Sequence, residues 1–166
     1  LVDPQVVVVY AGVMSVMDAD ELRFIIGHEL GHVRLGHTWL NSLMGGMSGI
    51  PSPYLAAILL YFAFRWWNRA CEYSADRAGL LACGKPEKAA LALIKLAGGS
   101  SAARSTEGRQ QALNRIEAED DRLENNLREM ISTHPMTVRR LKALREYAVS
   151  QEYHRLQAQL NSAHQI

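Results

Sequence analysis

Two histidines four positions apart constrain this chain more than any other feature. They are His28 and His32, in the stretch GHELGHVRLGH at residues 27–37, and Glu29 directly follows the first of them. On a helix, four residues turn the chain by about 400°, so both imidazoles project from one face and can bind one tetrahedral metal ion. Glu29 projects about 100° further round, where its carboxylate can take a proton from a water on that ion. The same short pattern also arises by chance, so other parts of the chain must support a metal site.

The flanks of this motif predict that it lies on a helix. Asp18 and Glu21 have the spacing of a capping box, in which side chains bond the free backbone N–H groups where a helix starts. We therefore expect a helix at about residues 19–35. Gly27 and Gly31 cost such a helix roughly 1 kcal/mol each relative to alanine. Their small size would let another element approach the helix closely.

The third ligand is predicted to be an acid on a later helix. Glu72 and Asp76 lie four apart in CEYSADRAG, on one face of that helix. Two acids so placed repel each other unless a cation or a hydrogen-bond donor lies nearby. An isolated pair would be interpreted as solvated acids paired with nearby arginines. Beside the histidine pair, we interpret Glu72 as a ligand and Asp76 as the acceptor for an N–H group of a ligand imidazole. Two histidines and one glutamate leave a fourth position for water, as in catalytic zinc sites.

His37 is a competing third ligand, which we reject. The metzincin pattern needs glycine three and histidine six residues after the second histidine of the motif. Here Gly36 and His37 follow His32 by four and five residues. On an unbroken helix, His37 would point about 180° away from His28. We interpret it as a histidine at the surface or at the helix end.

A long uncharged segment raises the question of a membrane. No charged residue occurs from Thr38 to Phe64, but three glycines and two prolines interrupt this segment. Its unbroken apolar part, 54–64, is too short for a span and favours a buried or interfacial segment. Tryptophans and arginines follow at once, which suits a membrane surface. We therefore expect an insert at residues 38–67 that is soluble or interfacial, with membrane contact through residues 50–69.

The rest of the chain is predicted to be mostly helical. Residues 6–10, VVVVY, form a β-branched run that predicts one strand. The remaining predictions are a long helix that ends near Gly84, a loop at 99–106, and helices at about 86–98, 107–130, 136–149 and 151–160.

Composition narrows the classes of function. The chain has 18 Lys plus Arg against 17 Asp plus Glu, so no basic field indicates a nucleic-acid partner. Its 166 residues fit a single domain, at 1–166. The first residue is Leu1, so we expect a chain shortened at its N-terminus. Cys71 and Cys83 would lie roughly 18 Å apart on one helix, too far for a disulfide, which indicates two buried thiols in a reducing compartment.

Three motifs in order give the chain a family resemblance. HELGHVRLGH, EYSADRAGLLACG and STHPMTVRRLKAL span most of the chain. Together they resemble the HtpX-like and CAAX-prenyl-endopeptidase family of zinc metallopeptidases, which are gluzincins. The resemblance implies one zinc ion per chain, held by His28, His32 and Glu72, with Glu29 as the general base.

The third motif carries two further expectations. The resemblance implies that His134 stabilises the oxyanion of the tetrahedral intermediate, and that Arg140 orients that site or binds the substrate backbone. A developing negative charge does need donors placed in advance. Without the resemblance, His134 would be a turn residue before Pro135, and Arg140 would belong to a solvated helix face beside Arg139.

These observations predict an α+β, predominantly helical, zincin-like metallopeptidase domain. The resemblance implies that the short N-terminal strand pairs with extended substrate, whereas the run alone would predict an ordinary core strand. The active site would lie between two helices. The predicted function is a zinc-dependent endopeptidase that cleaves a peptide or protein substrate, in a membrane-associated or cytoplasmic bacterial protein. The alternative is a latent or inactive zinc-binding module at a membrane interface. A purely structural zinc site would be closed by a fourth protein ligand, for which Cys71 is the nearest candidate.

Overall fold

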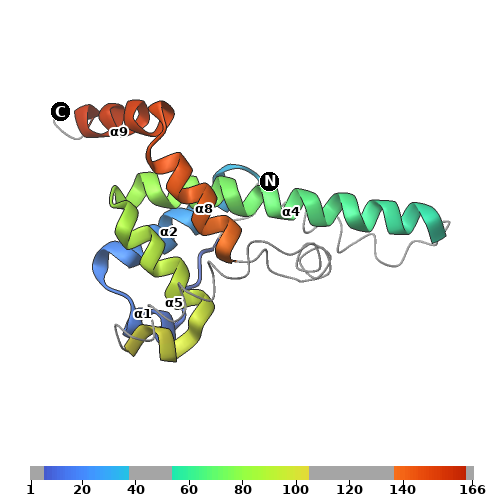
Figure 1. Cartoon of the computed structure of the whole chain (residues 1–166), viewed down its shortest axis with the longest axis horizontal. Coiled ribbons are helices and arrows are strands. Elements are labelled where there is room, and N and C mark those ends of the chain that lie inside the picture. Colours follow the sequence, from blue (N-terminus) through green and yellow to red (C-terminus); the bar gives the residue numbers. More distant parts are fainter. Residues whose placement is uncertain (1–5, 38–53, 105–136, 164–166) are drawn as a thin grey trace.

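The described part of the chain is helical. The computed structural model describes residues 6–37, 54–104 and 137–163, and these ranges contain no strand. In Figure 1, α2, α5 and α8 gather around the second half of α4, while the first half of α4 extends beyond them. The helices are α1 (Ala11–Val16), α2 (Ala19–Arg34), α4 (Tyr54–Cys83), α5 (Pro86–Arg104), α8 (Thr137–Ala148) and α9 (Gln151–Ala163).

Helix α2 starts at the predicted capping box. The carboxylate of Asp18 accepts the backbone N–H of Glu21 at 3.0 Å, and the Glu21 carboxylate accepts the Asp18 N–H at 2.8 Å. Two lysines of α5 pair with these acids: Lys88 with Asp18, and Lys95 with the buried Glu21 at 2.6 Å. The box therefore fixes the start of α2 and also joins α2 to α5.

Helices α2 and α4 cross in backbone contact. A methyl group on Gly27 would come within 2.5 Å of the Cβ of Ala82, and one on Gly31 would come within 2.8 Å of the Cβ of Ala78. Both distances are shorter than real side chains tolerate. The expectation that these glycines allow a close approach is confirmed, and the approaching element is the helix that carries Glu72.

The core lies to one side of this crossing. Phe24 of α2 and Leu80 of α4 are fully buried, and they pack with residues of α5, α8 and α9. The core side chains are Met17, Phe24, Ile25, Leu80, Cys83, Ala89, Ala92, Leu93, Leu144, Tyr147, Ala148 and Tyr153. Because α8 is anchored in this core, its first turns are held near α4. Cys71 and Cys83 are both buried free thiols, as predicted.

Several predicted elements differ from the structure. Residues 6–10 have no regular secondary structure, and Val6 and Tyr10 are each 76% exposed. A β-branched run becomes a strand only when another segment pairs with its backbone, and the described ranges contain no such segment. The predicted strand is therefore not confirmed. Helix α5 runs through Gly98 and Gly99 to Arg104, because glycine weakens a helix without ending it.

The uncharged segment is described only from Tyr54, where α4 begins; residues 38–53 and the predicted helix at 107–130 lie outside the described residues. Within the described ranges, no helix combines the length and the apolar character needed to cross a bilayer. The single-domain assignment stays a prediction.

Candidate metal centre

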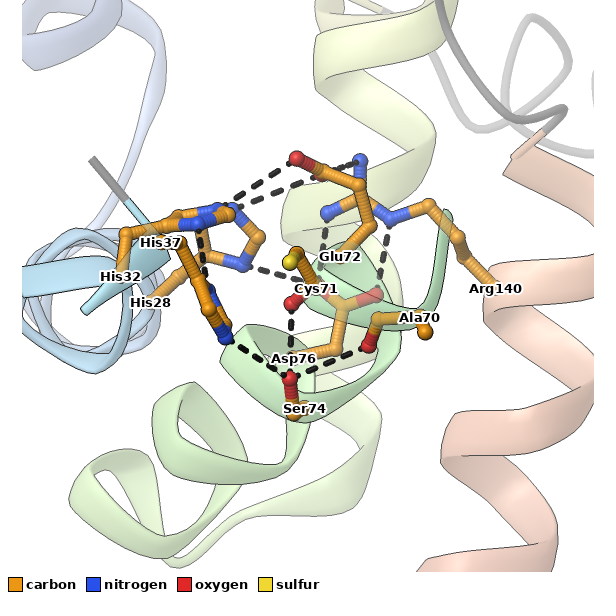
Figure 2. Close-up of polar contacts among 9 residues, drawn as sticks. All are labelled: His28, His32, His37, Ala70, Cys71, Glu72, Ser74, Asp76 and Arg140. Atoms are coloured by element: carbon orange, nitrogen blue, oxygen red, sulfur yellow. Dashed lines mark hydrogen bonds and ion pairs between the residues drawn. The ribbon is translucent and has the colours of Figure 1, made fainter. Parts of the chain in front are cut away.

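Three potential ligands converge where α2 passes α4. His28 and His32 point from one face of α2 toward Glu72 on α4 (Figure 2). The Nε2 atom of His32 lies 3.1 Å from Nε2 of His28 and 3.3 Å from Oε1 of Glu72, and Oε2 of Glu72 lies 3.7 Å from Nε2 of His28. The potential ligand atoms of the three residues all lie within 4.8 Å of one another. Two nitrogens on one tetrahedral zinc ion would lie about 3.3 Å apart, so this donor set fits such an ion.

Asp76 lies behind the first histidine. Its side chain is 2% exposed, and its Oδ1 atom lies 3.0 Å from Nδ1 of His28. Arg140 of α8 approaches the same carboxylate with two N–H groups, its Nε at 2.7 Å from Oδ2 and its Nη2 at 2.6 Å from Oδ1. An acid that accepts the Nδ1 proton of His28 leaves the lone pair of Nε2 directed at the ligand cluster.

Arg140 bridges both acids of α4. Its Nη1 atom lies 2.9 Å from Oε2 of Glu72, in addition to the two contacts with Asp76. Burial opposes ionisation of Glu72, but the hydrogen bond from His32 and the charge of Arg140 lower its pKa to about 2. The structure thus brings Arg140 into contact with the cluster. The resemblance implied that Arg140 either orients the site or binds the substrate backbone, and these contacts are compatible with the orienting role.

Glu29 lies at the open side of the cluster. Its side chain is exposed and lines a cavity of about 570 Å³ together with the three potential ligands and Arg140. The rest of the cavity wall is apolar apart from the Tyr10 hydroxyl and consists of Val8, Val9, Tyr10, Val13, Phe24, Ile25 and Leu96. A carboxylate beside the ligand cluster and an apolar wall next to it therefore line the same cavity. His134 lies outside the described residues.

His37 was expected at the surface or at the helix end; it does lie just beyond the end of α2, but it is buried. It is 8% exposed, and its Nδ1 atom lies 2.9 Å from Nδ1 of His32. Its ring also packs edge-on against Trp67, with ring centroids 5.9 Å apart. The prediction assumed an unbroken helix, but Gly36 has φ +74°, a left-handed conformation that turns the chain back toward α2. Gly36 was the available sequence signal, since glycine commonly occupies this position after a helix.

Sequence comparison identifies the family. The model of peptidase family M48 matches residues 3–62 and 49–148. This chain belongs to peptidase family M48. The family is metal-dependent, and the His28, His32 and Glu72 group supplies a donor set that could hold its ion.

Curated relatives carry peptidase names. A protease HtpX homolog of Moorella thermoacetica is 29% identical over 182 residues, covering 90% of this chain and 61% of the relative. The chloroplastic plastoglobule-localized metallopeptidase 48 of Arabidopsis thaliana is 28% identical, covering 93% of this chain and 48% of the relative. A protease HtpX homolog of Bifidobacterium longum is 28% identical, covering 82% of this chain and 55% of the relative. The chain thus spans between about half and three fifths of the length of these relatives. No solved structure matches it.

Cys71 is not a member of the ligand cluster. Among the described residues, the group that could hold a metal ion consists of two histidines and one glutamate. Burial and the neighbouring charge of Glu72 raise the pKa of the Cys71 thiol to about 11 in the metal-free chain. The described residues therefore show no fourth protein ligand that would close the site.

Proposed function

We propose that this chain is a zinc-dependent endopeptidase whose ion is held by His28, His32 and Glu72. The observation that carries the proposal is the convergence of these three side chains from two helices, with Glu29 beside them on the wall of the same cavity. Two histidines and one carboxylate form a common catalytic zinc set, which leaves one position free. The family supports peptide hydrolysis as the reaction.

The residues of the cluster take complementary parts in this proposal. Zinc would act as a Lewis acid and would lower the pKa of a water molecule. Glu29 accepts a proton from the attacking water and delivers it to the leaving amine. Asp76 holds His28 with its Nδ1 protonated, and Arg140 favours the ionised form of Glu72 and holds both acids of α4 in place. His134 would donate a hydrogen bond to the oxyanion, as the family resemblance implies.

Metal content and casein cleavage test this function together. We expect about one zinc per wild-type chain by mass spectrometry, and cleavage that a zinc chelator stops. Glu72→Gln keeps the size of the side chain but removes its charge, so this variant should retain much less zinc and lose cleavage. Wild-type chain that holds no zinc would refute the proposal. Zinc without cleavage would instead support the latent form.

We also propose that the first half of α4 contacts a membrane surface. Its exposed large hydrophobic side chains are 40% to 70% accessible, and Arg65 and Arg69 lie beside them in the same helix. They are Leu59, Leu60, Tyr61, Phe62 and Trp66. Apolar and aromatic side chains with neighbouring arginines suit the region between lipid headgroups and acyl chains.

Co-sedimentation with vesicles of phosphatidylcholine and phosphatidylglycerol tests this surface. Trp66→Ser should weaken binding, whereas Val149→Ser, an equally exposed apolar position outside α4, should not. Equal binding by both variants would count against a membrane contact at α4.

A further inference from the structure

His37 has a contact that the proposed mechanism does not use. Its Nδ1 atom meets the ring nitrogen of His32 that faces away from the ligand cluster, at 2.9 Å. Its Nε2 atom lies 3.5 Å from Oγ of Ser74, and that hydroxyl donates to the backbone carbonyls of Ala70 and Cys71 at 3.0 and 2.9 Å. Figure 2 shows this line of contacts running from His32 to the backbone of α4.

The ligand role of His32 determines which atoms donate along this line. A neutral imidazole that ligates through Nε2 must carry its proton on Nδ1. The Nδ1 atom of His37 must then accept that proton in a hydrogen bond, so His37 carries its own proton on Nε2 and directs it at Ser74. Every contact in the line is satisfied in this arrangement, in which the Ser74 hydroxyl accepts from His37 and shares its single proton between the carbonyl groups of Ala70 and Cys71.

The surroundings hold His37 in this orientation. The left-handed conformation of Gly36 turns the chain so that His37 faces α2 and α4, and the ring is buried against Trp67. The two ligand histidines thus have different supports. His28 contacts the carboxylate of Asp76, whereas His32 contacts a buried imidazole.

We propose that His37 is a positioning residue that accepts the Nδ1 proton of His32 and so holds its Nε2 atom ready to bind the metal. This inference rests on the proposed function, because it assumes that His32 is a ligand. His37 itself does not touch the ion or the substrate. Partners of ligand imidazoles in other proteins change metal affinity by about 10- to 100-fold when they are removed.

Zinc affinity of two matched variants tests the role of His37. His37→Phe keeps a ring against Trp67 but has no acceptor, so its Kd for zinc should rise by about 10- to 100-fold. In His37→Asn the side-chain oxygen can replace Nδ1 as acceptor, so its Kd should stay close to that of the wild type. Competition with a chromophoric chelator measures each Kd. The absorption spectrum of the cobalt(II) form should change in His37→Phe and be restored in His37→Asn.

Thermal unfolding of the metal-free proteins separates this role from a structural one. If the role of His37 is purely structural, its replacement should lower the unfolding temperature of the metal-free protein and leave the Kd of the folded protein for zinc unchanged. That result would overturn the proposal. Equal loss of affinity in His37→Phe and His37→Asn would also overturn it. If His37→Phe does not fold, Ser74→Ala decides: a smaller rise in Kd supports the proposal, and an unchanged Kd overturns it. Failure of the wild type to bind zinc would instead refute the proposed function itself.

Discussion

The Oδ1 atom of Asp76 lies 3.0 Å from Nδ1 of His28, and the same carboxylate is held from its other side by a guanidinium. One buried acid therefore serves an imidazole of α2 and Arg140 of α8 at once. The three helices that meet here are joined through a charge that is 2% exposed. Such a charge is tolerated only while its partners are present.

Removing the guanidinium should therefore destabilise the fold. We expect Arg140→Met to lower the free energy of unfolding of the metal-free protein by about 3 kcal/mol, because the Asp76 carboxylate is left buried without a cation. The double variant Asp76→Asn with Arg140→Met removes both charges and should regain part of this loss. Urea unfolding measures all three proteins. A double variant no more stable than Arg140→Met would contradict this explanation.

Glu29 should matter for hydrolysis and not for metal binding. Glu29→Gln keeps the size of the side chain but cannot accept a proton, so peptide cleavage should fall by about 10²- to 10⁴-fold. Zinc content should remain that of the wild type, since the carboxylate is not one of the three potential ligands. Cleavage rate and metal content are measured on the same preparation. Full activity in this variant would remove Glu29 from the mechanism.

The close crossing of α2 and α4 should be sensitive to a single methyl group. Gly31→Ala would place a Cβ atom 2.8 Å from that of Ala78, so the helices must move apart. Overpacking of this kind costs about 1–3 kcal/mol. We also expect weaker zinc binding, because the shift separates His32 from Glu72. Gly12→Ala is the control, since a Cβ there has no neighbour within 4 Å. Equal stability and zinc affinity of the two variants would show that the helices are not held at this distance.

The start of α2 should respond to pH through Asp18. A hydrogen bond from Lys88 and the backbone N–H of Glu21 lower its pKa from 3.8 to about 2. A lowered folded-state pKa adds stability above 3.8, which is lost as pH falls toward 2. Asp18→Asn keeps the cap without the charge. The difference in free energy of unfolding between the wild type and this variant should therefore shrink as the pH falls from 3.8 toward 2. Asp18→Ala should cost about 1 kcal/mol relative to Asp18→Asn at every pH, because it loses the cap. Thermal unfolding as a function of pH measures these differences.

Local sequence signals predicted the elements that they act on directly. The capping box placed the start of α2, and the glycines at 27 and 31 indicated a close neighbour. Helices α8 and α9 also agree closely with the predicted ranges. Capping and helix length depend on residues near one another along the chain, and the missing side chains of the two glycines can be read from the sequence directly, although the helix that approaches them cannot.

Other features depend on contacts between distant segments. A β-branched run at residues 6–10 is compatible with a strand, but pairing depends on a partner that the run does not specify. The contact of His37 with His32 was missed because the backbone angle at Gly36, which turns His37 toward α2, was not specified by the sequence pattern. The spacing of Glu72 and Asp76 indicated one helix face, yet it could not show that a single guanidinium holds both.

The guanidinium of Arg140, which contacts both Glu72 and Asp76, comes from a helix late in the chain. Arg140 is encoded 64 residues after Asp76, so both ligand-bearing helices leave the ribosome well before it does. Until α8 docks, Glu72 and Asp76 lack the guanidinium that contacts both of them. The cluster of potential metal ligands therefore gains its full set of contacts only when the last of the three helices is in place.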